Sequence, residues 1–501
     1  MVARRSVLAA AGGVGLLGAA GLVGRGAGVR ASGAPSPSVL EPVPTASLLD
    51  EDPVAHLVRR LAPAPSVDLV AVVRAIGESA WLEAQLDPPA RPGPGTLQPA
   101  LDELALETMT AAEFVTAHRA ARDRDRTDRD AADALLPPPV ELAASLLLRR
   151  VVGDQPVLES MVELWSDVLH VHIGHDAGTR LLTPLLVRDV LRPHALGRFD
   201  DLLVAVTTSP AMLLYLDGGR SRLGAVNENH ARELLELHTV GVGAHDEDDV
   251  AAVARVLTGW VVDPNTGASR LVPRRHDDAV VEVLDWRGVG AADDGEDLLR
   301  HLAQHPDTAE RVARALAVRF VSDDPSPGLV AELADVYLDA DTAIVPVLRA
   351  LVGHAEFAAA PGAKLRRPMT FATAALAGVA PGLGVGRGGG LLRAVAGGVT
   401  TLGHSPLGWP APDGYPDVAP AWVSSAAALG RWALATDLAV LAGDDWLPDV
   451  AAVLEELPRR MLLEPLSAPL LDELAAAASA APDPVIAATA LVLDLPASHL
   501  R

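Results

Sequence analysis

Apolar residues recur at helical spacing through most of the chain, and this periodicity constrains the fold more than any other feature. Residues 54–61 are one example, with apolar side chains three or four positions apart, as on one face of an α-helix. The clearest strand signals lie in residues 270–288, where two β-branched runs flank His276 and Asp277 and predict a hairpin. We therefore expect a mainly α fold: a large multi-helix body with a small β-hairpin insertion and long Pro/Gly/Trp-rich loops.

Composition excludes several classes of function. The 501 residues carry a formal net charge of −24, which argues against a nucleic-acid partner because phosphate binding needs clustered basic surface. The chain has no cysteine, which rules out disulfides, thiolate metal sites and a cysteine nucleophile. Any metal ion would need nitrogen and oxygen ligands from His, Asp, Glu, Asn or the backbone.

The N-terminus has the features of an export signal. Arg4 and Arg5 precede a Gly/Ala-rich apolar run over residues 7–23, and a small-residue cleavage site ends at Ala31. This pattern predicts a twin-arginine signal peptide over residues 1–31; a Sec signal or an uncleaved anchor is the alternative. No later run of this length is free of charge, so we expect an exported protein (periplasm, cell wall or extracellular) without a transmembrane span in the mature chain.

Segments rich in Pro, Gly and Ser predict where the domains begin and end. Residues 32–50 are Pro/Ser-rich and indicate a linker, residues 51–440 a main helical domain, and residues 441–501 a C-terminal helical extension packed on it. Within the main domain, residues 110–134 predict a charged helix in which Arg and Asp alternate. A solvated, salt-bridged face accounts for that alternation.

The segment NENHARELLELHTVG, residues 227–241, concentrates polar side chains in a short run. Either Asn227 or Asn229 is a suitable N-cap for a helix, and Gly241 is a suitable end. The leucines give the helix a buried face. Three charged residues four positions apart predict a salt-bridged stripe: Glu228, Arg232 and Glu236.

Helix formation leaves three side chains of this segment without a structural role: His230, Glu233 and His238. His230 and Glu233 share a face at ligand-like spacing, which favours either metal ligation or a buried polar network that shapes a site. We predict catalytic roles for these three residues together with Glu228. The amides of Asn227 and Asn229 are candidates for holding a cofactor.

Two further clusters contain candidate metal ligands. His170 and His172 lie in a run of three histidines within six residues, and His276 with Asp277 occupies the expected hairpin turn. Imidazole and carboxylate groups are suitable ligands for a divalent metal ion. The alternatives are histidines that favour a helix C-terminus and ordinary turn chemistry.

Two more motifs predict ligand contacts. In the run RPHALGRF, residues 192–199, His194 and Arg198 could receive an anionic group, with Arg198 in a catalytic role; a helix junction tied to acidic neighbours is the alternative. Trp409 lies in the proline-rich loop 408–416, where a rigidly held aromatic ring could face a ligand or a sugar. Core filling is the alternative for Trp409.

Taken in order, these motifs resemble a bacterial family called domain of unknown function 1800. The resemblance covers roughly residues 50–440 and includes these pieces: Trp165, RPHALGRF, SPAMLLYLD, NENHARELLELHTVG, LTGW, His276-Asp277, Arg319-Phe320-Val321, KLRRP and the 408–432 stretch. It implies an exported, mainly helical protein with no established catalytic residue. Genes of this family often neighbour a sulfatase-like family, which implies a protein partner.

The chain departs from the family pattern at one point. Relatives commonly carry an Asn-His pair after the motif tryptophan, and here Asp167 and Val168 occupy those positions. If that histidine were an essential ligand, this protein would be impaired, or His170 and His172 would have to replace it.

Two hypotheses follow. The first is an exported metal- or cofactor-dependent enzyme, an oxidoreductase or hydrolase with a site lined by His, Glu and Asn and an N/O-ligated metal ion as its cofactor. The second is a non-catalytic envelope or secretion-associated protein that binds a partner protein or a polysaccharide.

Overall fold

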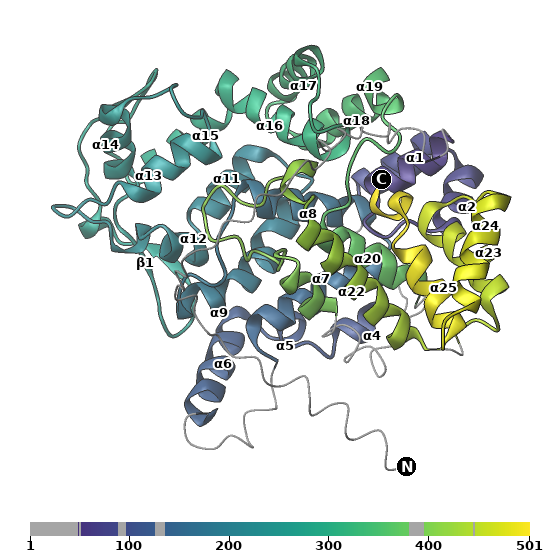
Figure 1. Cartoon of the computed structure of the whole chain (residues 1–501). Coiled ribbons are helices and arrows are strands. Elements are labelled where there is room, and N and C mark those ends of the chain that lie inside the picture. Colours follow the sequence, from purple (N-terminus) through teal and green to yellow (C-terminus); the bar gives the residue numbers. More distant parts are fainter. Residues whose placement is uncertain (1–48, 50–51, 89–96, 126–135, 380–394, 444–445) are drawn as a thin grey trace, which may run out of the picture. The chain divides into compact units, whose positions relative to one another are not determined.

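The computed structural model describes residue 49 and residues 52–88, 97–125, 136–379, 395–443 and 446–501. Helices dominate this part of the chain (Figure 1), which confirms the expected mainly α fold. The predicted signal peptide, residues 1–31, lies outside the described residues. The helices are α1 (Pro53–Leu61), α2 (Val67–Ile76), α3 (Glu78–Leu86), α4 (Leu97–Leu101), α5 (Ala105–Thr108), α6 (Ala111–Asp125), α7 (Pro138–Val152), α8 (Pro156–Val168), α9 (Ala177–Leu186), α10 (Arg192–His194), α11 (Phe199–Thr207), α12 (Pro210–Tyr215), α13 (Asn229–Glu233), α14 (Glu247–Val256), α15 (Asp294–Ala303), α16 (Pro306–Phe320), α17 (Pro327–Asp339), α18 (Ile344–Gly353), α19 (Ala355–Ala358), α20 (Pro368–Val379), α22 (Ser425–Ala442), α23 (Val450–Leu462), α24 (Ala468–Ser479) and α25 (Pro484–Leu493).

Two of the described helices, α12 and α17, begin at a Ser-Pro pair, for a local reason. The Ser209 hydroxyl accepts the Met212 N–H at 3.3 Å at the start of α12, and the Ser326 hydroxyl accepts the Leu329 N–H at 3.1 Å at the start of α17. Proline occupies the first helical position, where a missing N–H costs no hydrogen bond.

Two short antiparallel pairs form the β structure of the described residues. Strand β1 (Trp260–Val262) pairs with β2 (Ser269–Leu271), and β3 (Glu282–Val283) pairs with β4 (Trp286–Arg287). The pairing expected across His276 is therefore wrong, although a small hairpin is present. Each strand instead pairs with its nearest neighbour across a shorter turn, because Pro273 after β2 has no N–H with which to continue a ladder.

The first hydrophobic core surrounds α8. Trp165 on this helix is completely buried, its ring centroid lies 5.4 Å from that of Phe199, and its indole N–H donates to the Ala195 carbonyl at 2.9 Å. Helices α11, α16, α17 and α18 are among the elements that contribute the other apolar side chains of this core. The motif tryptophan thus has a structural role, in which burial supplies its free energy and the hydrogen bond satisfies its polar atom.

A second core lies among α20, α22, α23 and α25. Helix α7 lies between the two cores, since Leu142 and Leu146 belong to the first while Leu147 and Leu148 belong to the second. The C-terminal helices (yellow in Figure 1) share the second core with α20 and α22. No helix among the described residues is both long and apolar enough to cross a membrane.

Buried charges connect elements of both cores. We call this set the buried ion network: Arg150, Glu163, Asp167, Arg319, Asp323, Lys364, Arg367 and Asp417. Four cations thus meet four carboxylates. Mutual pairing of this kind offsets the large cost of removing charges from water.

Candidate functional site

A cleft of about 330 Å³ lies against the buried ion network. We call it the His238 cleft, and its lining comes from α8, the segment after α13, α16 and the loop after residue 408. The lining residues are Leu164, Asp167, Val168, Leu237, His238, Arg311, Val312, Arg314, Ala315, Val318, Arg319, Asp413, Tyr415 and Asp417. Its volume lies within the range of small-molecule sites, roughly 300–1,000 Å³, and four separate family motifs contribute to it.

The 408–417 loop is held tightly against the end of α8. Gly414 has φ +71°, and a Cβ atom at this position would lie 2.0 Å from the Asp167 carbonyl oxygen. Only glycine allows so close an approach with this backbone conformation. Earlier in the loop, the Trp409 indole N–H donates to the Asp413 carboxylate at 2.8 Å, and the Trp409 carbonyl lies 2.8 Å from Nε2 of His170. The loop is therefore a fixed wall of the cleft.

His238 reaches the cleft because the helix changes its winding. Helix α13 continues as a π-helical segment, Leu234–His238, and the Gly241 N–H then bonds to the Leu235 carbonyl at 2.8 Å. A π turn contains more residues than an α turn, so it shifts the faces of the residues that follow. His238 is 3 % exposed, and its Nε2 atom has no hydrogen-bond partner among the described residues.

Burial keeps the imidazole of His238 neutral. Burial is the main cause that lowers the pKa of His238 to about 3, and the electrostatic effect of neighbouring groups, among them Arg311, contributes to that value. These neighbours include His230, for which burial lowers the pKa to about 4. Neither ring nitrogen of His230 has a hydrogen-bond partner within the described part of the chain. Unsatisfied polar atoms at such depth cost free energy, which is why they mark candidate functional groups.

The charged lining residues differ in whether they already have partners. Arg319 contacts Asp167 at 2.8 Å and Asp417 at 2.7 Å, so its charge is compensated within the ion network. Arg311 is exposed and donates to the Leu237 carbonyl at 2.7 Å, and it makes no ion pair with any residue that the structure describes. Arg311 is therefore the cation at the cleft that is available to an anionic ligand.

Five of the predicted site residues lie in the neighbourhood of this cleft: His170, His230, Glu233, His238 and Trp409. The electrostatic neighbours of His238 include His230 and His170, and His170 contacts the Trp409 carbonyl. Burial raises the pKa of Glu233, and the nearby acidic residues raise it further. These residues come from separate segments, so only the folded chain brings them together.

Other predicted residues have structural partners elsewhere. Arg198 pairs with Asp200 at 2.8 Å and Asp341 at 2.5 Å, and Nδ1 of His194 lies 2.8 Å from the Val190 carbonyl. These contacts correspond to the helix junction considered as the alternative for that motif.

The residues of the expected hairpin turn are also engaged. Nδ1 of His276 lies 3.1 Å from the Thr258 carbonyl, and Asp277 pairs with Arg255 at 3.1 Å. His172 lies beside His170 and is only partly buried. No group of three or more His, Asp or Glu side chains that could hold a metal ion occurs in the described ranges. The role of His170, His172, His276 and Asp277 as metal ligands stays a prediction.

The start of the 227–241 segment is exposed. The Asn227 side-chain oxygen accepts the Asn229 N–H at 2.9 Å, and the Asn229 amide lies 3.4 Å from the Leu216 carbonyl. Glu228 is 3.7 Å and Glu236 3.8 Å from Arg232, which forms the stripe expected from their spacing. Their roles in catalysis or cofactor binding stay predictions.

Comparison with known proteins gives one match. A family described as "Protein of unknown function (DUF1800)" matches residues 56–498. The chain belongs to this family. No curated protein and no solved structure matched.

The DUF1800 match includes nearly all of residues 441–501, the segment predicted to be a C-terminal extension, and these helices share the second core with α20 and α22. The division at residue 440 stays a prediction.

Sequence reasoning assigned no functional role to the charged residues around the cleft: Asp167, Arg311, Arg319, Arg367 and Asp417. One signal was available. Lys364 is the single lysine of a chain that has 41 Lys and Arg in total, and its ammonium group lies 2.5 Å from Asp323 and 3.6 Å from Asp417. The single lysine of the chain lies in a DUF1800 motif, which indicated that this position requires an ammonium group.

Proposed function

We propose that the protein is an exported hydrolase whose active site is the His238 cleft and whose substrate is a small anionic ester or amide. The observation that carries this proposal is the buried, neutral His238 with an unpartnered Nε2 beside the unpaired cation Arg311. Nε2 of a neutral imidazole can accept a proton from water. Arg311 would hold the negative charge of the substrate by charge-assisted hydrogen bonds.

The low pKa of His238 is compatible with this role. Without a bound ligand, the His238 imidazole is unprotonated throughout the physiological pH range. Binding of an anion nearby favours the protonated form and so raises the pKa during the reaction. Glu233, whose pKa is raised by burial, would supply the proton that the leaving group needs.

Substitution of the two groups separates their roles. Wild type, His238→Ala and Arg311→Gln would be assayed against p-nitrophenyl esters with neutral, carboxylate, phosphate and sulfate substituents. We expect His238→Ala to lower kcat by about 10²-fold or more, and Arg311→Gln to raise KM for the anionic esters by about tenfold. His301→Ala, at a half-buried histidine paired with Asp285, is the control. An unchanged rate in His238→Ala refutes the proposal.

The metal-dependent version of the enzyme hypothesis has its own test. Metal analysis and an absorption spectrum of protein purified from a twin-arginine-competent host would detect a bound ion or chromophore. A stoichiometric metal that survives His238→Ala would place its ligands elsewhere, and loss of the metal in that variant would assign His238 as a ligand.

A second candidate function, binding of a partner protein or polysaccharide without catalysis, has one observation in its favour. Helix α22 and its flank expose large apolar side chains, among them Val423, Leu429 and Trp432 at 67 %, 62 % and 57 %. Contiguous exposed apolar surface is typical of interaction sites. Pull-down with the neighbouring gene product and glycan binding, compared between Trp432→Ala and Trp409→Ala, would test this function. Unchanged binding in both variants argues against it.

A further inference from the structure

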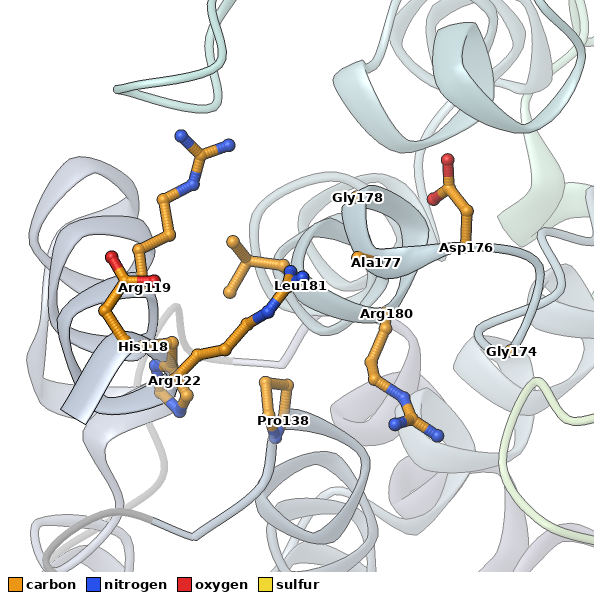
Figure 2. Close-up of a pocket in the computed structure, with 11 residues that line it drawn as sticks. His118, Arg119, Arg122, Pro138, Gly174, Asp176, Ala177, Gly178, Arg180 and Leu181 are labelled. Atoms are coloured by element: carbon orange, nitrogen blue, oxygen red, sulfur yellow. The ribbon is translucent and has the colours of Figure 1, made fainter. Parts of the chain in front are cut away.

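A second hollow, separate from the His238 cleft, lies between α6 and α9. Its volume is about 760 Å³. We call it the α6–α9 hollow, and its walls include Arg119 and Arg122 from α6 and Arg180 from α9 (Figure 2). The first turn of α9 forms another part of the wall, where the positive end of the helix dipole favours an anion. Three arginines against two carboxylates, Asp123 and Asp176, leave the lining of the hollow with a net positive charge.

The three arginines are available to a ligand. All three are exposed, and within the described part of the chain none of them makes an ion pair. Most of the other arginines on the helices that the structure describes have a carboxylate partner, as expected for a chain with 65 acidic residues against 41 Lys and Arg. The acidic wall residues are engaged, since Asp176 caps the Thr179 N–H at 2.7 Å and Asp123 has a partner of its own.

A smaller apolar cavity of about 90 Å³ adjoins the hollow and shares Arg119, Gly178 and Leu181 with it. Its other walls are mainly apolar side chains, among them Leu214 and Val262. The turn that leads to Gly267 closes this annex, and a Cβ atom on Gly267 would lie 2.7 Å from Leu182. A cavity of roughly 150 Å³ accommodates benzene, so the annex has room for a short alkyl group but not for an aromatic ring.

We propose that the α6–α9 hollow binds an oxyanion that carries a short alkyl chain, with the head group on the α6 residues Arg119 and Arg122 and the chain in the annex. The solvated, salt-bridged face expected for α6 accounts for exposed arginines. It does not account for three cations without carboxylate partners around one hollow that opens onto an apolar cavity. The ligand class is an alkyl carboxylate or an alkyl phosphate.

Calorimetric titration of the full chain with two homologous series tests the proposal: acetate, butyrate and hexanoate, and the corresponding alkyl phosphates. Affinity should rise about fourfold for each methylene that enters the annex and level off once the annex is full. Higher salt should weaken binding. Tighter binding by either series supports the proposal and identifies the head group. Butanol and butylammonium, which carry no anionic group, should show no measurable binding to the hollow or to the annex.

Variants separate the head group from the chain. Arg119→Gln and Arg122→Gln should each weaken anion binding about fivefold, while Arg274→Gln, an exposed arginine without an ion pair among the described residues, should leave it unchanged. Val262→Phe should fill the annex, so acetate binding is retained and the dependence on chain length disappears. Melting curves confirm that each variant is folded. Absence of anion binding at about 10 mM, butanol binding equal to that of butyrate, or wild-type affinity in the Arg119→Gln/Arg122→Gln double variant overturns the proposal.

Discussion

Substitution of Arg367 by Met is the sharpest test of the buried ion network. Arg367 is 2 % exposed, contacts Glu163 and lies 2.8 Å from Asp167. Methionine has a similar length and no charge, so the substitution changes the balance from four cations and four carboxylates to three and four. Arginines hold the pKa of Glu163 well below its usual range although burial alone would raise it. Burial already raises the pKa of Asp167 despite its arginine neighbours, and Glu163 keeps Arg150 and Arg319 nearby. Loss of Arg367 therefore leaves the carboxylates of the network with less compensation than they have in the wild type.

The expected cost follows from this surplus charge. Removing one partner of a buried ion pair costs about 3–5 kcal/mol, and we expect about 3 kcal/mol because Arg319 still contacts Asp167 at 2.8 Å. With an unfolding entropy of about 2.1 cal/mol/K per residue over about 450 residues, this cost corresponds to a melting temperature about 3 °C lower. High salt should not change the effect, because buried charges are poorly screened.

Differential scanning calorimetry at pH 7 measures this shift, and two variants provide its controls. Arg431→Met removes an arginine of similar burial that bonds the Arg366 carbonyl and is not part of the ion network, so we expect about 1 kcal/mol. Arg367→Met combined with Asp167→Asn restores the balance at three and three, and should recover at least half of the lost stability. An Arg367→Met shift no larger than that of Arg431→Met, or strictly additive effects in the double variant, would refute the reasoning.

Three further predictions concern the cleft and its surroundings. The pKa of His238 is about 3 in the folded chain against the ordinary 6.5, so between these values the unfolded chain binds a proton at this residue and the folded chain does not. The contribution of His238 to the free energy of unfolding is therefore complete above pH 6.5 and falls by about 3 kcal/mol towards pH 4. Melting temperatures measured across that pH range should fall less in His238→Asn than in the wild type. Gly414→Ala should cost at least about 1–2 kcal/mol from its left-handed backbone alone and more from the clash with Asp167, whereas Gly403→Ala, with φ +76° and open space around it, should show only the backbone term; equal shifts in calorimetry would contradict the tight loop contact. Lys364, with a side chain 1 % exposed, should react with an amine-specific acetylating reagent about 10²-fold more slowly than in urea-unfolded protein, as followed by peptide mass spectrometry; rapid labelling of the folded chain would show that the ion network opens readily.

Much of the scaffold follows from local sequence. Helical periodicity predicts the mainly α fold, and Ser-Pro pairs such as Ser326-Pro327 begin helices because the hydroxyl caps the first turn. The polar stripe around Arg232 forms as its spacing requires. These features depend on residues within one or two turns of each other, so their physics is contained in the segment itself.

The ion network could not be predicted in the same way. Asp167 looked like a departure from the family pattern, yet in the folded chain it pairs with Arg319 and Arg367, which lie far along the sequence. Nothing in the local sequence around Asp167 indicates these partners. The π turn before His238 could not be predicted from the sequence either. Leucine and glutamate are common in ordinary α-helices, so their presence does not indicate the wider turn.

The charged residues of the ion network and of the His238 cleft fall into two groups, those that stabilise the fold and those that are available to a ligand. Arg319 has all of its charge compensated by carboxylates, so it has little left to offer a ligand, and its loss should lower stability and activity together. Arg311 and His238 have no such partners among the described residues, so substitution of Arg311 should change activity and leave the melting temperature within about 1 °C. Family motifs contribute both residues that stabilise the fold and residues that face the cleft, so membership of a motif does not show which role a residue has. Comparing the loss of activity with the loss of stability distinguishes the two roles, since only a group that contacts substrate can lower activity without lowering stability.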